Sequence, residues 1–313
     1  MSKELNYICC QPDDNYFTWQ VHLWLENLKL LGKSSSAIVL VFTPAFRETN
    51  KEKWQYLLDI YPEARFVFYK DEHEVSKNLG IYIPILRPYL LWRYWVDHPE
   101  MQEKAVFYYD CDVLLTEEFD LSEQKDNDTC YLSDTNSYIN ASYFDSKLRD
   151  VLPEKVEDYK KIDVLDNITR LVGVNRQIAE EHNLHSGGAQ YLLKNIDAAF
   201  WKKVMDDCIT IRMNLMNVNK TYFESESKGF QSWCADMWSI LWNLWYTNRP
   251  TEITPAMDFS WAPDPIEKLK THKLYHNAGI VGEMQDNCPC FYKAKYHQGD
   301  NPMSDPQIDL VLN

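Results

Sequence analysis

The sequence lacks the glycine-rich motifs by which many nucleotide-binding proteins hold phosphate. No G-x-G-x-x-G follows the first apolar segment, residues 5–10, and no G-x-x-x-x-G-K-[ST] occurs in the chain. These absences exclude a dinucleotide-binding Rossmann unit and a P-loop NTPase. No apolar run approaches the roughly 20 residues needed to span a bilayer. The polar start of the chain does not resemble a signal peptide, so we expect no membrane span.

Basic residues are few relative to acidic ones. The chain has 32 Lys and Arg against 47 Asp and Glu, which gives a net charge of -15. Binding to duplex nucleic acid requires basic patches, so this balance argues against such a partner. The acidity fits a protein that recruits a cation in order to hold a phosphate ligand.

The eight cysteines do not form the disulfide framework of a small secreted domain. Six are scattered through apolar segments, whereas Cys288 and Cys290 lie near the end with one residue between them. A zinc site needs four ligands at recognisable spacings, and this pair has no obvious second pair. We therefore expect free thiols and a reducing cytoplasm.

The most informative stretch is residues 105–115, AVFYYDCDVLL. Its apolar residues predict a buried strand, and Asp110 and Asp112 stand near its end. Residues i and i+2 of a strand point to the same side, so both carboxylates can converge on a divalent cation that relieves their repulsion. In open α/β sheets, ligands bind at this end of the strands. An ordinary acidic turn is the alternative interpretation.

Strand and helix patterns alternate before this stretch. Apolar segments at 5–10, 37–43 and 64–69 are separated by helical patterns at 17–31 and 51–61. This β-α-β-α-β order predicts a mostly parallel sheet with flanking helices. We expect one α/β domain over residues 1–313.

The second half offers two further patterns. Gly187 and Gly188 precede an apolar run, where they would allow a ligand to approach the backbone or simply form a tight turn. Trp238, Trp242 and Trp245 fall on one face of the helix predicted at 231–245. Such a stripe can stack on sugars, but it more often belongs to the core.

Four motifs occur in a familiar order: Asp13-Asp-Asn-Tyr16, Arg87, Tyr109-Asp-Cys-Asp112 and His276-Asn-Ala-Gly279. With them the chain resembles the GT-A fold glycosyltransferases, most closely the retaining, metal-dependent family 8 type. It resembles the plant peptidyl serine and hydroxyproline glycosyltransferases more distantly.

The resemblance implies that residues from 1 to about 125 bind nucleotide and metal, and that those from about 126 to 313 form the sugar and acceptor half, including a C-terminal acceptor-side lobe. It also implies a role for each motif. Asp110, Asp112 and His276 would bind Mn²⁺, with Mg²⁺ as a second possibility. The nucleotide would be bound by residues from the first turn, the helix before the metal motif and the tail: Asp13, Asn15, Tyr16, Arg87, Lys293 and Lys295. The sugar would be bound by His185, Ser186, Gly187, Gly188 and Gly279. Asp236 would be the catalytic base or a sugar-hydroxyl contact.

Three departures from the family qualify these roles. His185 replaces an expected Asn in the sugar-binding turn, and Cys234 and Ala235 replace Asp and Gln before Asp236. The lysine that follows H-x-x-G in the family is absent. Lys293 or Lys295 would have to supply its charge.

The resulting hypothesis is transfer of a sugar from a nucleotide-diphosphate donor, UDP by resemblance, to a hydroxyl of a glycan, protein or lipid. One alternative is a nucleotidyltransferase or phosphohydrolase that uses the same two carboxylates. It would need further acids, for which Glu117 and Glu118 are available. The other alternative is a non-catalytic carbohydrate-binding protein on the same fold.

Overall fold

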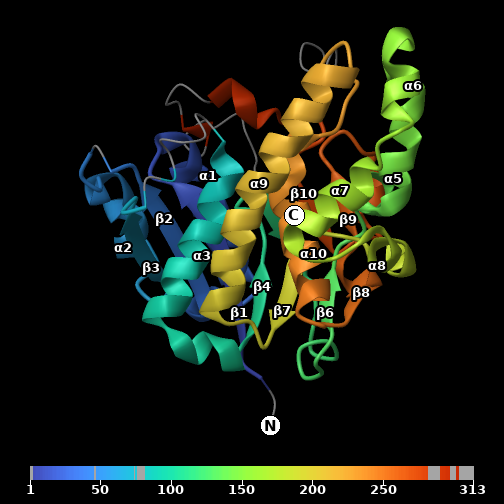
Figure 1. Ribbon diagram of the computed structural model, residues 1–313. Coiled ribbons are helices and arrows are strands. Elements are labelled where there is room, and N and C mark those ends of the chain that lie inside the picture. Colours follow the sequence, from blue (N-terminus) through green and yellow to red (C-terminus); the bar gives the residue numbers. More distant parts are fainter. Residues whose placement is uncertain are drawn as a thin grey trace.

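The computed structural model describes residues 3–45, 47–73, 75, 82–280, 290–296 and 301–302. Cys288 and both extremes of the expected 1–313 domain lie outside these described residues. The first half follows the predicted alternation of strands and helices (Figure 1). Its elements are β1 (Leu5–Pro12), α1 (Asn15–Leu30), β2 (Ala37–Thr43), α2 (Gln55–Ile60), β3 (Arg65–Lys70), α3 (Leu86–Asp97) and β4 (Ala105–Tyr108).

These strands belong to a seven-stranded sheet of order β3-β2-β1-β4-β7-β6-β8. The strands β3, β2, β1 and β4 are parallel. Beyond them, β7 (Tyr191–Lys194) runs antiparallel to both β4 and β6 (Cys130–Leu132), and β8 (Thr251–Ile253) pairs parallel with β6 at the edge. The predicted mostly parallel α/β sheet with flanking helices is confirmed.

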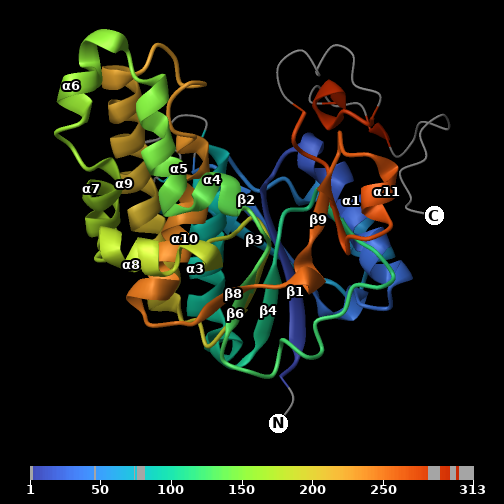
Figure 2. The same cartoon turned by 90° about the vertical axis from the view of Figure 1, so that its right-hand side faces the viewer.

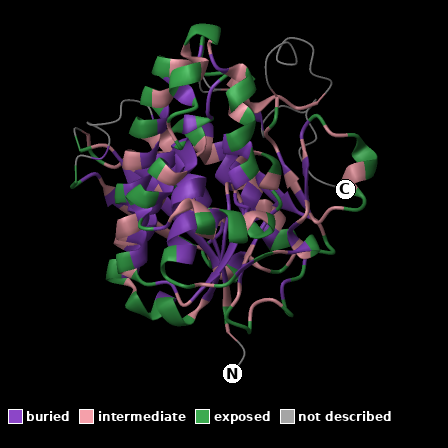
Figure 3. Ribbon diagram, turned by 45° about the vertical axis from the view of Figure 1, so that its right-hand side comes forward, coloured by how far each residue is buried: buried purple, intermediate pink, exposed green. Residues whose placement is uncertain are grey.

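Helices cover the sheet on both faces. Figures 1 and 2 show α3, α9 (Ala198–Tyr222) and α10 (Ala235–Tyr246) on one face and α1 on the other. All seven residues of β2 are buried, as a strand covered on both faces requires. The buried residues gather along this sheet and its inner helices (Figure 3).

The tryptophans of α10 belong to that core. Trp238, Trp242 and Trp245 are all buried, which confirms the core interpretation of the stripe. Between β6 and β7 the chain forms short helices. They are α4 (Asn136–Ile139), α5 (Ala141–Ser146), α6 (Val156–Tyr159), α7 (Val164–Val172) and α8 (Arg176–Glu181).

A second, three-stranded sheet has the order β5-β10-β9. It consists of β5 (Val113–Leu115), β9 (Phe259–Trp261) and β10 (Leu274–His276), and the short helix α11 (Ile266–Leu269) connects the last two. The continuous strand predicted at 105–115 is therefore wrong in its middle. The chain turns after β4, where the Val113 N–H donates to the Asp110 carbonyl at 3.1 Å, because Asp is poorly suited to a strand interior.

The cysteines differ in part from the sequence-based expectation. Six cysteines are free thiols, but Cys290 is disulfide-bonded, so the free-thiol prediction is wrong for that residue. A disulfide joins two cysteines, whereas a zinc site needs four ligands. The lack of a second cysteine pair argued against zinc but not against a disulfide. Disulfides are typical of oxidising compartments, and the cytoplasmic location stays a prediction.

The sequence predicts no membrane span, and the helices of the structure can be compared with that prediction. Within the described ranges, no helix is long and apolar enough to cross a membrane.

Candidate metal centre

The two aspartates stand where the main sheet gives way to the second one. β4 ends at Tyr108, and the chain turns through Asp110 and Asp112 before β5. Antiparallel pairing places His276 opposite Val113, and the Asn277 N–H donates to the Asp112 carbonyl at 2.9 Å. The register of β10 on β5 therefore brings the imidazole next to the turn.

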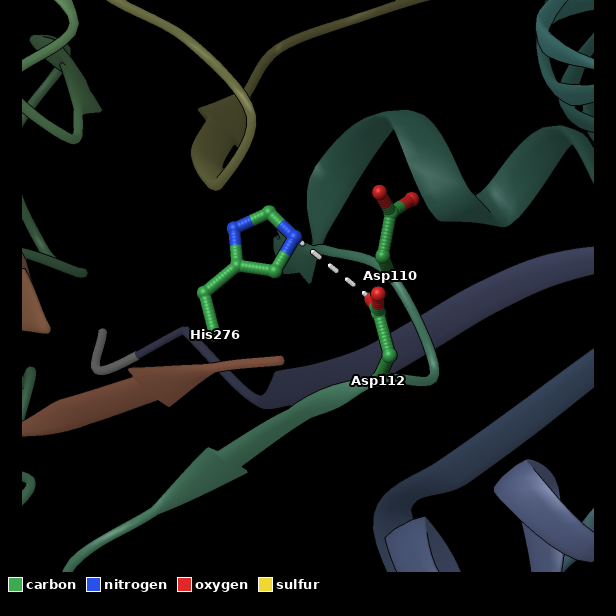
Figure 4. A group of neighbouring side chains, drawn as sticks. All are labelled: Asp110, Asp112 and His276. Carbon is green, nitrogen blue, oxygen red and sulfur yellow. Dashed lines mark ion pairs between the residues drawn. The ribbon is translucent and has the colours of Figure 1, made fainter. Parts of the chain in front are cut away.

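Asp110, Asp112 and His276 each offer a ligand atom, and these atoms lie within 4.8 Å of one another. Figure 4 shows one ring nitrogen of His276 directed at the Asp112 carboxylate, with Asp110 nearby. Nε2 of His276 is 3.6 Å from Oδ1 of Asp112, which is too long for a hydrogen bond. The buried Oδ1 atom has no hydrogen-bond partner in the part of the chain that the structure describes. Two carboxylates, one of them with an orphaned oxygen, and an imidazole fit a divalent cation.

His276 is held as a neutral ligand. Its side chain is buried, and burial lowers the pKa of the imidazole to about 4, with Asp110 opposing the shift. Trp261 stacks on the ring at a centroid distance of 5.0 Å. On the side away from the carboxylates, Nε2 of Gln190 lies 3.1 Å from Nδ1 of His276. A neutral imidazole is the form that binds metal.

Arg87, from α3, connects the triad to α10. It donates to Asp110 at 2.9 Å and to Asp236 at 2.9 Å. Burial opposes the guanidinium charge, but Asp110 and Asp236 outweigh it and raise the pKa of Arg87 further. Burial also raises the pKa of Asp236, with Arg87 opposing. The predicted catalytic carboxylate thus lies beside the triad, paired with an arginine.

A second cation approaches from the tail. The Lys293 ammonium contacts Oδ2 of Asp112, and burial lowers its pKa to about 8. Lys295, on the same turn, is exposed. Asp112 and Lys293 also line a cavity of about 410 Å³ between α1, the second sheet and the tail. This cavity offers room for a ligand next to the triad.

The predicted nucleotide turn lies at the end of β1. Asp13 is fully buried, and its carboxylate accepts from Trp54 Nε1 and the Asn50 N–H, each at 2.9 Å. Asn15 is exposed at the start of α1, whereas Tyr16 is buried. In the structure Asp13 therefore holds the fold through hydrogen bonds. The nucleotide-binding roles of Asp13, Asn15 and Tyr16 stay predictions.

The predicted sugar-binding turn is packed against protein atoms. A Cβ atom at Gly187 would lie 2.4 Å from the Ser133 carbonyl oxygen, and one at Gly188 would lie 2.6 Å from the Tyr191 hydroxyl. Ser186 is buried, whereas His185 is exposed and is not in the triad.

Gly279 has a separate reason to be glycine. Its φ of +85° lies in the left-handed region. It ends the short segment that carries His276, and its role toward a sugar stays a prediction.

Sequence reasoning missed Gln190 and Trp261. Gln190 lies two residues beyond the glycine pair, with no motif of its own, and Trp261 meets His276 only through the pairing of β9 with β10. Burial and pairing, rather than local pattern, bring them to the site. Trp261 could have been found by predicting the register in which β9 pairs with β10.

Comparison with known proteins gives weak likenesses. No protein-family model and no curated protein matches the chain. Among solved structures, the WbbM bifunctional glycosyltransferase is similar with a TM-score of 0.47 and 11% identity, over 96% of this chain and 52% of that one. Mouse xyloside xylosyltransferase 1 is similar with a TM-score of 0.37 and 10% identity, over 88% of this chain and 98% of that one. The chain thus spans about half the length of WbbM. With TM-scores below 0.5, neither likeness adds support for a function.

Proposed function

We propose that the chain is a metal-dependent glycosyltransferase that takes a sugar from a nucleotide-diphosphate donor to an acceptor hydroxyl. The observation that carries the proposal is the Asp110, Asp112 and His276 triad flanked by two cations, Arg87 and Lys293. A divalent ion bound by the triad supplies Lewis-acid stabilisation of a diphosphate. The order of the GT-A motifs in the sequence, including the family 8 resemblance, supports the same assignment.

The chain's own residues have separable tasks in this proposal. Lys293 would leave Asp112 and add its charge to the leaving diphosphate, where preorganised cations stabilise the transition state. Arg87 would orient Asp110 and stay neutralised by Asp236. The cavity beside Asp112 and Lys293 would receive part of a substrate.

The state of Asp236 favours retention of configuration. An inverting enzyme needs a free carboxylate as base, but Asp236 accepts a hydrogen bond from Arg87 at 2.9 Å. In the retaining course, the bond from the anomeric carbon to the phosphate oxygen breaks and the bond to the acceptor oxygen forms on the same face. The acceptor proton passes to the leaving phosphate. Asp236 then contacts the sugar or holds Arg87 in place.

A nucleotidyltransferase or phosphohydrolase is the second candidate. Of the further acids it could use, Asp236 is paired with Arg87, and Glu117 and Glu118 are not at the site. Glu118 is paired with Lys273 and exposed. Neither Glu117 nor Glu118 joins the triad in the described part of the chain. The carboxylate set is therefore smaller than that reaction requires.

The test is a donor screen. Purified protein is incubated with a panel of nucleotide sugars, UDP-sugars first, with Mn²⁺, Mg²⁺ or chelator, and the released products are identified. Metal-dependent release of nucleoside diphosphate from one donor, lost in Asp112→Ala, is expected. Release of pyrophosphate would favour the nucleotidyltransferase. Donor binding without turnover, in the presence of acceptor candidates, would favour a carbohydrate-binding protein.

A further inference from the structure

His276 has one ring nitrogen facing the carboxylates and the other facing Gln190. Nδ1 of His276 is 3.1 Å from Nε2 of Gln190, and an amide NH₂ can only donate. In this arrangement Nδ1 accepts, so the neutral ring carries its proton on Nε2. That proton occupies the nitrogen which faces Oδ1 of Asp112. A metal that binds through Nε2 requires the other tautomer, with the proton on Nδ1 and an acceptor beside it.

Two buried oxygen atoms flank this ring and have no hydrogen-bond partner among the described residues. One is Oδ1 of Asp112 on the carboxylate side, and the other is Oε1 of Gln190, a residue with no exposed surface. A buried acceptor left unpaired is costly. They lie at the two ends of one imidazole, so a rearrangement of Gln190 together with a bound cation can satisfy both.

That rearrangement is a half-turn of the Gln190 amide. It places Oε1 of Gln190, in place of its Nε2, beside His276. Oε1 of Gln190 then accepts from Nδ1–H of His276, and the lone pair on Nε2 of His276 becomes free. A cation bound there would also engage Oδ1 of Asp112. Metal-binding histidines commonly donate their second N–H to such an acceptor, which fixes the tautomer and orientation of the ring.

The backbone fixes Gln190 in this place. Gln190 directly precedes β7, whose Tyr191 pairs with Tyr108 at the end of β4. Its carbonyl accepts from the Ser133 N–H at 3.2 Å. Ala189, the residue before it, has a φ of +67°, a left-handed conformation that is uncommon for alanine and typical of constrained sites.

We infer that Gln190 is a positioning residue for the metal centre, and that its amide selects the His276 tautomer that binds the cation. The inference rests on the metal site of the proposed function. Gln190 contacts neither the cation nor the substrate. It acts through the orientation and proton of the imidazole.

Binding of Mn²⁺ alone, measured by calorimetry without donor or acceptor, tests the inference. We expect Gln190→Leu to weaken Mn²⁺ binding by about 10- to 100-fold, as loss of such a partner does at other metal sites. Gln190→Glu keeps an acceptor for Nδ1–H and should bind Mn²⁺ at least as tightly as the wild type. Asn219→Leu is the matched control, because Asn219 is a buried amide whose side chain bonds Phe230 and is not in the triad. It should leave the affinity unchanged.

The outcomes separate this inference from the proposed function. Wild-type affinity in Gln190→Leu, with binding lost in Asp112→Ala, would overturn the role of Gln190 and leave the metal site standing. No Mn²⁺ binding by the wild type would overturn both. Should Gln190→Leu fail to fold, ¹⁵N shifts of labelled histidine in the wild-type protein decide. The inference requires the proton on Nδ1 of His276 after addition of diamagnetic Mg²⁺, and a ring that keeps its proton on Nε2 would overturn it.

Discussion

Oδ1 of Asp112 and Nε2 of His276 face each other at 3.6 Å across the junction of the two sheets. Asp112 reaches this point from the turn after β4, and His276 reaches it from β10. The gap is too wide for a hydrogen bond and is bordered by the carboxylate of Asp110. The charges around this gap, and the contacts that position Asp112, His276 and Asp110, therefore decide whether a cation binds there.

Removal of Arg87 should destabilise the fold strongly. Arg87→Met leaves Asp110 and the buried Asp236 without their shared cation, which should cost about 3–5 kcal/mol in the free energy of unfolding. Urea denaturation measures this loss. Adding Asp236→Asn to Arg87→Met should recover part of it, because one of the two buried charges is removed.

Arg170→Met is the control for that experiment. Arg170 pairs with Asp166 on the surface, and its side chain is 65% exposed. A loss below about 1 kcal/mol is expected for such a pair. Equal losses in Arg87→Met and Arg170→Met would contradict the bridging role of Arg87.

Substitution of Lys293 should affect metal binding and turnover in opposite directions. Its ammonium contacts Asp112, so Lys293→Met should tighten Mn²⁺ binding by about tenfold, roughly the effect of one nearby like charge. The same variant should release nucleoside diphosphate about 10- to 100-fold more slowly, because a cation at the leaving group is lost. Lys161→Met, at an exposed surface pair with Asp158, should change neither. Unchanged affinity and rate in Lys293→Met would refute the assignment.

The glycine pair should matter for packing. In Gly187→Ala, the new methyl group would lie 2.4 Å from a backbone oxygen of Ser133, which cannot move aside as a flexible side chain can. A loss of about 3 kcal/mol is expected, at the upper end for overpacking. Gly32→Ala meets no atom within 4 Å and should lose only about 1–2 kcal/mol from its left-handed backbone. A Gly187→Ala protein of full stability but reduced donor affinity would instead assign Gly187 to ligand binding.

Lys194 should give stability a recognisable pH dependence. It is buried and donates to the Gln124 carbonyl and to Asn127, and burial lowers its pKa to about 8. The unfolded chain keeps this proton up to a pKa of about 10.4. Between these two values the unfolded state binds more protons, so stability should rise with pH.

The comparison variant for this effect is Lys194→Met, which has no proton to lose. The difference in unfolding free energy between wild type and variant, measured from pH 7.5 to 9.5, should shift in favour of the wild type. Buried tyrosines and cysteines remote from Lys194 titrate alike in both proteins and cancel, whereas Cys130 is coupled to Lys194 and contributes to the measured difference. A difference that does not change with pH would show that Lys194 titrates normally.

The sequence predicted the main sheet well because its strands are buried on both faces. The spacing of α1 favours a helix, and the shortness and β-branched residues of the β2 run favour a strand. The direction of β7 could not be predicted, since an apolar run such as Tyr191–Lys194 is the same in parallel and antiparallel pairing.

The structure brings the three predicted ligand residues together, but through a geometry that the sequence did not predict. The prediction relied on strand alternation to align Asp110 and Asp112, whereas the structure aligns them through a turn and the pairing of β10 with β5. The sequence could not predict the role of Gln190 for a related reason. Its position depends on the junction of β7 with the turn before it, which is a tertiary feature.

Pulsed EPR of protein-bound Mn²⁺ in the presence of UDP tests the proposed metal centre most directly. We expect a ¹⁴N coupling from the His276 imidazole and a ³¹P coupling from the diphosphate on the same ion. His276→Ala should abolish the ¹⁴N coupling. Bound Mn²⁺ that shows no ¹⁴N coupling in the wild type, or no ³¹P coupling with UDP, would contradict a metal centre that holds a nucleotide diphosphate.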